Sequence, residues 1–290
     1  MGKGNLAVWV IGSEGMLGKE ISELLESRKI FHCGTGMDCD ITDMEALLSF
    51  SRGKKITHII NCAGYTAVER AEEEPEKAYS LNALGPKNIA EAANAIRAVI
   101  VHISTDYVFD GKNMEGYKED APVNPVSVYG RTKAYGELFV QNDAQKFYIV
   151  RTSWLYGIHG SNFVNTMLKL MNERDEVLVV DDQHGSPTYT CDLARFILFL
   201  IETKKTYGIY HFSNLGETTW HGFAREIYKI GRKLGLIDSE CVIKSINSAE
   251  YPSKAARPKY SKLLQGKSPE YPNNHWQKSL LAFLERLNGL

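Results

Sequence analysis

The stretch Leu6-Ala7-Val8-Trp9-Val10-Ile11-Gly12-Ser13-Glu14-Gly15-Met16-Leu17-Gly18 decides the fold. Its first six residues are apolar, as is typical of a strand buried on both faces, and they run directly into glycines spaced three apart. Such glycines allow a sharp turn, a close approach of backbone to a pyrophosphate, and tight packing of the next helix. The N-terminus of that helix offers unpaired N–H groups to phosphates. A glycine triplet alone can also be no more than a tight strand–helix turn.

The rest of the first half repeats this strand–helix alternation. The alternation predicts right-handed βαβ units and a Rossmann-type, doubly wound parallel sheet of the α/β class. At the start of the second helix, Thr42 with Glu45 predicts a capping box. The predicted strands are residues 6–11, 30–33, 57–62, 98–103 and 147–150, and the predicted helices are 16–25, 43–50, 76–96 and 128–142.

The second half is less regular and predicts a smaller α/β lobe. It contains expected strands at 177–180 and 209–213, expected helices at 192–201 and 220–234, and loops from residue 243 that precede a final helix at 280–287. We expect a dinucleotide-binding domain over residues 1–157 and a mainly substrate-binding lobe over 158–290, and segments of the two can interchange.

Composition excludes several classes of partner. The chain has 290 residues, 43% of them hydrophobic, and a formal net charge of −1, so nothing attracts it globally to nucleic acid or to an anionic membrane. Five cysteines without a C-x-x-C pair suit reduced thiols, which predicts a cytoplasmic protein. The apolar run at 6–11 is too short for a signal-peptide core or a membrane span.

A second motif carries chemistry. Tyr129-Gly130-Arg131-Thr132-Lys133 places a phenol and an ammonium on one face of a helix. Hydride transfer to a ketone leaves an alkoxide that needs a proton, and a tyrosine can supply it if a neighbouring cation lowers its pKa from about 10. The strand end Ile103-Ser104-Thr105-Asp106 adds hydroxyls at the sheet edge where such folds bind ligands. The alternative is a lysine that lies along a packed tyrosine.

With these motifs, several further segments resemble the dTDP-4-dehydrorhamnose reductase family of the extended short-chain dehydrogenase/reductases. The glycine spacing G-x-x-G-x-x-G is similar to that of the extended group, and Arg-Thr-Ser-Trp and Gly-Ser-Pro-Thr are far more particular than the two general motifs. The matching segments are 61–68, 104–109, 129–133, 151–157, 162–164, 182–188 and 256–258.

The resemblance implies an oxidoreductase that uses NADPH, or NADH, to reduce the C4 ketone of dTDP-4-dehydro-L-rhamnose to dTDP-L-rhamnose. It implies a catalytic group of Thr105, Tyr129 and Lys133. The residues expected at the cofactor are Gly12, Gly15, Met16, Leu17, Gly18, Asp40, Ile41, Ala63, Gly64, Tyr65, Thr66, Ile103, Tyr129 and Lys133. Those expected at the substrate are Thr105, Asp106, Trp154 and Arg257.

Each of these assignments has a plainer alternative. Asp40 can be part of a helix entry, Trp154 can belong to the core, and Arg257 can be a surface residue instead of a partner for a diphosphate. The acidic run 69–76 is expected to be a solvated helix face, and His184 and His211 are expected to be structural. For the whole chain, the alternatives are a reductase or epimerase of another nucleotide sugar, or a non-catalytic regulatory subunit with the same fold.

The sequence departs from familiar patterns at two places. The second strand ends in Cys33-Gly34-Thr35-Gly36, without the carboxylate of an NAD site, so we expect NADPH to be moderately better and Thr35→Asp to favour NADH. Some members of the resembled family dimerise through magnesium held by glutamates. Glu20 could serve, but Cys191 stands where another is needed, so no obligatory metal is expected. A monomer or a homodimer both remain open.

Overall fold

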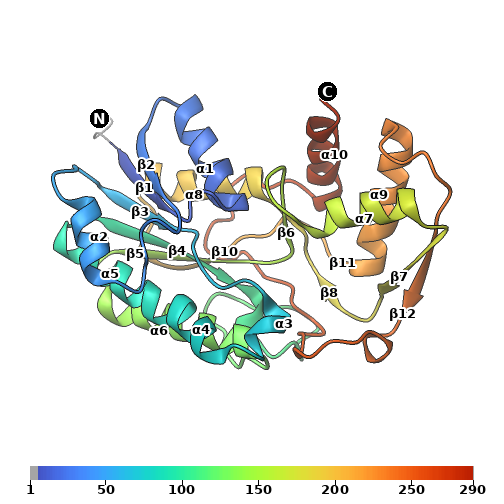
Figure 1. The fold of residues 1–290 in the computed structure, drawn as a ribbon, viewed down its shortest axis with the longest axis horizontal. Coiled ribbons are helices and arrows are strands. Elements are labelled where there is room, and N and C mark those ends of the chain that lie inside the picture. The colour runs from blue at the N-terminus through green and yellow to red at the C-terminus, as the bar shows by residue number, and fades with distance from the viewer. Residues whose placement is uncertain (1–5, 290) are drawn as a thin grey trace.

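The computed structural model describes residues 6–289 and contains a parallel sheet with a smaller lobe beside it (Figure 1). All pairings in the sheet are parallel, and the strand order is β10-β5-β4-β3-β1-β2. The order reverses between β1 and β3, and this confirms the predicted doubly wound sheet. The strands are β1 (Ala7–Ile11), β2 (Phe31–Thr35), β3 (His58–Asn61), β4 (Val99–Thr105), β5 (Phe147–Thr152) and β10 (Gly208–His211).

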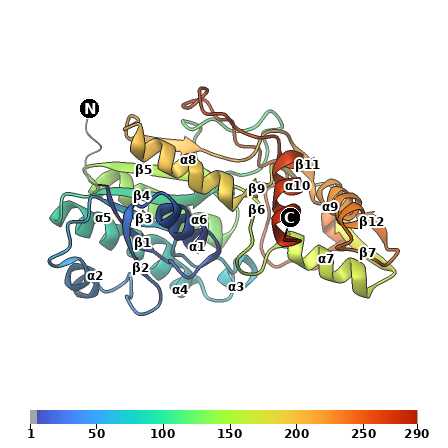
Figure 2. The ribbon, with the colours of Figure 1, turned by 90° about the horizontal axis from the view of Figure 1, so that it is seen from above.

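Helices cover both faces of the sheet, which is why β1 is apolar and buried along its whole length. Val8 and Val10 of β1 point to a core with α1 (Met16–Ser27) and α8 (Thr190–Glu202). Trp9 and Ile11 point the other way, to a core shared with α2 (Met44–Ser51), α5 (Gly85–Ala95) and α6 (Val128–Asp143). Figure 2 shows α1 and α8 together over the sheet.

Two local predictions need correction. The second helix is capped by Asp43, whose carboxylate accepts from the backbone N–H groups of Glu45 and Ala46, and not by Thr42. Thr42 instead donates its hydroxyl and its N–H to Asp40. The helix predicted at 76–96 is three segments: α4 (Pro75–Tyr79), a π-helical turn (Ser80–Leu84) and α5. A π turn inserts an extra residue into the helix, which apolar periodicity does not reveal.

The second lobe has its own hydrophobic core. The prediction of loops after residue 243 was wrong for β12 (Val242–Ile246), which pairs in parallel with β7 (Glu176–Val180). That strand is mostly exposed, so it lacks an apolar run. The helices of the lobe are α7 (Phe163–Glu173), α9 (Trp220–Leu234) and α10 (Trp276–Leu287). Two short strand pairs complete it: β6 (Leu155–Tyr156) with β9 (Thr188–Tyr189), and β8 (His184–Gly185) with β11 (Thr218–Thr219). The short helix α3 (Val68–Ala71) belongs to the sheet domain.

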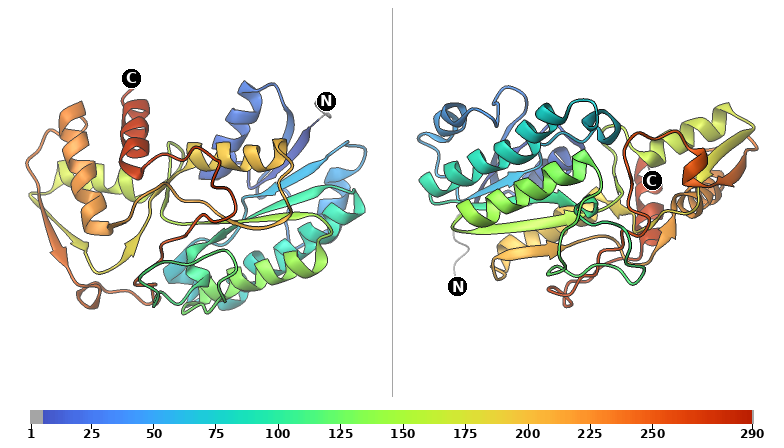
Figure 3. Two further views of the ribbon diagram at one scale, coloured as in Figure 1. Left: turned by 180° about the vertical axis from the view of Figure 1, so that it is seen from behind. Right: turned by 90° about the horizontal axis from the view of Figure 1, so that it is seen from below.

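The two halves of the chain are interwoven. α8 and β10 come from the second half of the chain but belong to the domain of the main sheet. β10 is its edge strand, and α8 packs on it beside α1. A long segment after β12 returns from the lobe to the sheet side (Figure 3), where Leu263 bridges to Tyr117. The domain boundary at residue 157 therefore stays a prediction. Within residues 6–289, every helix is too short or too polar to cross a membrane.

Candidate active site

The glycine loop lies at the point where the strand order reverses. Gly12 has φ +76°, and a Cβ there would lie 2.7 Å from the amide nitrogen of Ala63, which follows β3. A Cβ on Gly18 would lie 2.1 Å from the Gly12 carbonyl oxygen. Gly15 caps α1 without any side-chain acceptor, so the first N–H groups of the helix stay available. Met16 and Leu17 begin that helix. This backbone cradle fits a dinucleotide pyrophosphate.

The loop after β3 is held by a residue that the sequence analysis missed. Asn82, buried in the π turn, accepts from Tyr65 N (2.8 Å) and donates to Tyr65 O (3.0 Å). A Cβ on Gly64 would lie 2.9 Å from Asn82 Oδ1 and 4.0 Å from Lys133 Nζ. Of the expected cofactor residues Ala63, Gly64, Tyr65 and Thr66, Gly64 lies next to the lysine of the catalytic motif. In the sequence, Asn82 could have been noticed as a polar residue within a helical pattern of apolar residues.

The catalytic motif comes together at the end of β4. The Thr105 hydroxyl donates to Asp106 Oδ1 (3.0 Å) and lies next to the Tyr129 phenol. The Tyr129 ring meets the edge of Tyr107, with ring centroids 5.4 Å apart. Burial raises the pKa of Tyr129 well above its ordinary value, and the hydrogen bond with Thr105 offsets only part of that rise. The phenol is therefore fully protonated at neutral pH and can act as a proton donor.

Lys133 follows one turn later on α6. Its Nζ is buried and donates to the carbonyl oxygen of Ile103 (2.6 Å). Burial lowers the pKa of Lys133 to about 8, while Glu137 and Cys62 act in the opposite direction. We expected Lys133 to lower the pKa of Tyr129. In the structure burial dominates that pKa, and the nearest partner of the ammonium is a backbone carbonyl.

A buried ion pair connects the helix of the catalytic motif, α6, to the sheet. Arg151 of β5 binds Glu137 of α6 through two hydrogen bonds, Nε to Oε1 at 2.9 Å and Nη2 to Oε2 at 2.7 Å. Both side chains are 2% exposed. The Ser104 hydroxyl also donates to Glu137. The pair therefore ties α6, which carries Tyr129 and Lys133, to the strand end that carries Thr105.

Two of the expected substrate residues line the edge that faces the lobe. Burial raises the pKa of Asp106 to about 6, and hydrogen bonds from Ser261 and Thr105 oppose the rise. Trp154 has φ +46° and stacks on Trp220, with ring centroids 3.7 Å apart. A Cβ on Gly185 would lie 2.7 Å from the Trp154 ring, so the Gly-Ser-Pro-Thr segment makes room for the indole.

Arg257 is held by the acidic run. Its Nη2 donates to Glu69 Oε1 at 2.7 Å, and Ser253 donates to the same oxygen. Glu74 accepts from the Tyr65 hydroxyl at 2.8 Å. The run 69–76 is partly exposed, as expected of a solvated face, but its carboxylates also form specific contacts. Several of its carboxylates join the loop after β3 to the returning segment of the lobe.

Asp40 and Ile41 lie beside α2 and α5. Asp40 is exposed and binds Thr42, while Ile41 is buried against Gly85. The structure speaks against the expectation that Thr35→Asp favours NADH. The Thr35 side chain is 1% exposed, and its hydroxyl accepts a hydrogen bond from the Trp9 indole at 3.0 Å. A carboxylate there would be buried in the core and not at a ribose.

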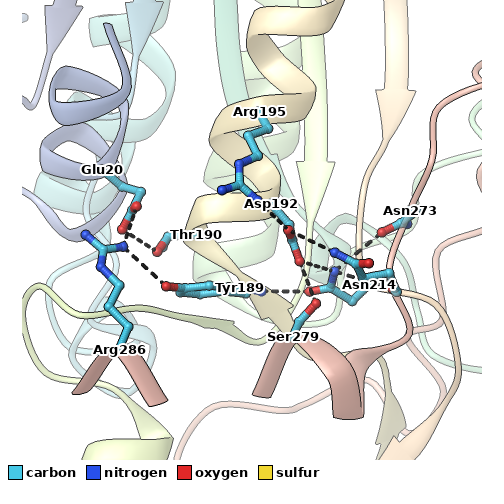
Figure 4. Close-up of polar contacts among 10 residues, drawn as sticks. Glu20, Tyr189, Thr190, Asp192, Arg195, Asn214, Asn273, Ser279 and Arg286 are labelled. Atoms are coloured by element: carbon cyan, nitrogen blue, oxygen red, sulfur yellow. Dashed lines mark hydrogen bonds and ion pairs between the residues drawn. The ribbon is translucent and has the colours of Figure 1, made fainter. Parts of the chain in front are cut away.

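One acidic cluster among residues 6–289 has a geometry suited to a metal: Glu20, Glu23 and His159. The Arg286 guanidinium of α10 already binds Glu20 at 2.7 Å (Figure 4). It also binds Glu23 at 2.9 Å. It also donates to the hydroxyl of Tyr189 at 3.2 Å. The cluster thus has a cation from the same chain, and it joins α1 to the C-terminal helix.

The parallel sheet, the glycine loop and the threonine–tyrosine–lysine group define an oxidoreductase of the short-chain dehydrogenase/reductase type. The family model described as the RmlD substrate binding domain matches residues 6–288. The chain belongs to this family, the dTDP-4-dehydrorhamnose reductases.

Known relatives match over nearly their full length. The dTDP-4-dehydrorhamnose reductase of Streptomyces griseus is 40% identical, with 97% of this chain and 94% of the relative covered. The crystal structure of a dTDP-4-dehydrorhamnose reductase from Clostridium acetobutylicum has a TM-score of 0.92 at 42% identity, covering 97% and 99% of the two chains. The enzyme of Bacillus anthracis in complex with NADP has a TM-score of 0.93 at 38% identity, covering 98% and 100%.

Proposed function

We propose that the protein reduces the C4 ketone of dTDP-4-dehydro-L-rhamnose to give dTDP-L-rhamnose. The observation that carries the proposal is the junction of the Thr105 hydroxyl with a half-buried, protonated Tyr129, one helical turn from Lys133. A regulatory subunit of the same fold would not need these three groups together. The bound reduced nicotinamide, NADPH or NADH, supplies the hydride.

Each residue of the catalytic group has a distinct task in this proposal. Thr105 positions the carbonyl oxygen at the end of β4. As negative charge develops on that oxygen, Tyr129 transfers its hydroxyl proton to it, so the product leaves as an alcohol. The Lys133 ammonium then stabilises the tyrosinate by its positive charge and holds the cofactor ribose. A proton from solvent restores Tyr129.

The remaining expectations are part of the same proposal. The expected cofactor residues surround the glycine loop and the loop after β3, while Asp106, Trp154 and Arg257 face the nucleotide sugar from the side of the lobe. We also propose a cytoplasmic location, supported by five free cysteines, and a monomer or homodimer without an obligatory metal.

The test is the oxidation of NADPH and NADH, followed by absorbance, with dTDP-4-dehydro-L-rhamnose and with GDP- and UDP-linked ketosugars. We expect turnover with the dTDP sugar and little with the others. Faster turnover of a GDP- or UDP-linked ketosugar would assign the enzyme to another nucleotide sugar. Binding of a dinucleotide without turnover of any ketosugar would favour the regulatory alternative.

A further inference from the structure

One carboxylate of the acidic run, Glu69, holds the segment that returns from the lobe after β12. It lies on α3, shortly after the loop that follows β3, and the returning segment runs past this helix (Figure 1). Its oxygens accept hydrogen bonds from the Ser253 hydroxyl at 2.8 Å, the Lys254 N–H at 2.8 Å and the Ala255 N–H at 3.2 Å. These three bonds fix the backbone just before Arg257.

The same carboxylate also binds the Arg257 side chain. The guanidinium Nη2 lies 2.7 Å from Glu69 Oε1, and the two side chains are 27% and 41% exposed. Partial burial opposes ionisation of Glu69, but hydrogen bonds from Arg257, Ser253 and the backbone lower its pKa to about 2, so it is charged at neutral pH. A guanidinium carries five N–H donors in one rigid plane, so a bond at Nη2 restricts the direction of all the others.

Arg257 lies close to the catalytic group. Burial of its hydroxyl raises the pKa of Tyr107 to about 12, and the charge of Arg257 and a hydrogen bond with it oppose this rise. The Tyr107 ring in turn meets the edge of the Tyr129 ring. The Arg257 Nε is buried and has no hydrogen-bond partner among residues 6–289. A buried donor without a partner is costly, so this N–H is available to an acceptor that a ligand brings.

We infer that Glu69 is a positioning residue for the substrate: it holds Arg257 so that the free N–H groups of the guanidinium meet the diphosphate of the nucleotide sugar. This inference rests on the proposed function, in which the substrate is a dTDP-linked sugar. The diphosphate is the charged part of such a substrate, and arginine binds phosphate oxygens through its parallel N–H groups. Because Glu69 orders the arginine before the substrate arrives, less side-chain entropy is lost on binding.

The test measures the dissociation constant of dTDP by calorimetry, with KM and kcat for the dTDP-linked ketosugar as a second readout. Glu69→Ala should weaken dTDP binding about tenfold and raise KM by a similar factor. Because the diphosphate does not react, kcat should change by less than about threefold, and so should the affinity for NADPH. Glu69→Gln keeps an acceptor for Arg257, so its dTDP affinity should lie between those of the wild type and Glu69→Ala.

Glu73→Ala is the matched control. Glu73 belongs to the same acidic run and binds the same returning segment, but through the exposed side chain of Lys254, so its removal should leave dTDP affinity unchanged. A double-mutant cycle separates the positioning of Arg257 from general support of the segment. In an Arg257→Ala background, Glu69→Ala should weaken dTDP binding further by less than about twofold.

Unchanged dTDP affinity in Glu69→Ala would overturn the inference, as would a full tenfold loss in the Arg257→Ala background. Tighter dTDP binding in Glu69→Ala would overturn it as well, because Glu69 would then compete with the diphosphate for the arginine. If the wild type reduced no ketosugar, the proposed function would fail, whereas the dTDP affinities would still decide the role of Glu69.

Discussion

Arg151 and Glu137 form a two-pronged ion pair in the interior, 2% exposed on each side, between strand β5 and the helix of the catalytic motif. Arg151 also donates to the Glu119 carbonyl oxygen at 3.3 Å. The pair thus fixes the distance between α6 and the sheet. Neither residue needs to touch the substrate to set the geometry of the site.

Removing one partner should be costly, because the other charge then stays buried without compensation. We expect Glu137→Gln to lower the free energy of unfolding by about 3–5 kcal/mol, measured by urea denaturation. Glu202→Gln, which breaks the exposed pair with Arg28, is the control and should cost less than about 1 kcal/mol. Similar losses in the two variants would show that the buried pair has no special role.

Tyr129→Phe should fold and bind the dinucleotide but lose turnover by about 10²–10⁴-fold, because only the proton donor is removed. Single-turnover kinetics and dinucleotide affinity are the measurements. Tyr135→Phe removes an exposed hydroxyl from the same helix and should keep wild-type turnover. If Tyr129→Phe turned over at a near-normal rate, Tyr129 would not be the acid.

Lys133→Met should weaken dinucleotide binding as well as turnover. The pKa of Lys133 is about 8, so the fraction of ammonium falls as the pH rises through that value. We therefore expect wild-type dinucleotide affinity to decrease above about pH 8, and this pH dependence to be absent in Lys133→Met. Lys87→Met, at an exposed site on α5, is the control. Unchanged affinity with reduced turnover would exclude the ribose contact.

Asp106→Asn should raise the free energy of unfolding at neutral pH. The folded-state pKa of about 6 lies above the ordinary value of 3.8, so between these values the folded state binds more protons than the unfolded state. The stability contributed by Asp106 therefore falls as the pH rises through this window, and the penalty is complete above about 6. At neutral pH the variant should gain up to about 3 kcal/mol, and almost nothing near pH 4. Urea unfolding at several pH values tests this, and a pH-independent difference would contradict it.

Gly185→Ala should displace the Trp154 indole, because the added Cβ would lie 2.7 Å from the ring. We expect a higher KM for the nucleotide sugar, unchanged dinucleotide affinity, and a stability loss of about 1–3 kcal/mol from overpacking. Trp220→Phe, which keeps an aromatic partner for Trp154, should have a smaller effect on KM. If KM were unaffected by Gly185→Ala, Trp154 would not contact the substrate.

The sequence by itself determined the first five strands of the sheet, most of the helices between them and the glycine loop. Continuous apolar runs and the turn residues after them act locally, so β1, α6 and α9 begin within a residue of where the pattern predicts. The order of motifs along the chain also predicted Thr105, Tyr129 and Lys133. These residues follow strands or lie on a helix whose packing direction is already set by the doubly wound fold.

Only the tertiary structure decided which distant residues meet. Asn82 supports Tyr65, Arg151 neutralises Glu137, Arg286 binds Glu20, and Glu14 packs on Gly36. Each partnership joins separate elements, so its energy depends on three-dimensional distance and burial and leaves no periodic signal along the chain. The same reason accounts for the pKa of Tyr129, which burial governs more strongly than the motif that contains it.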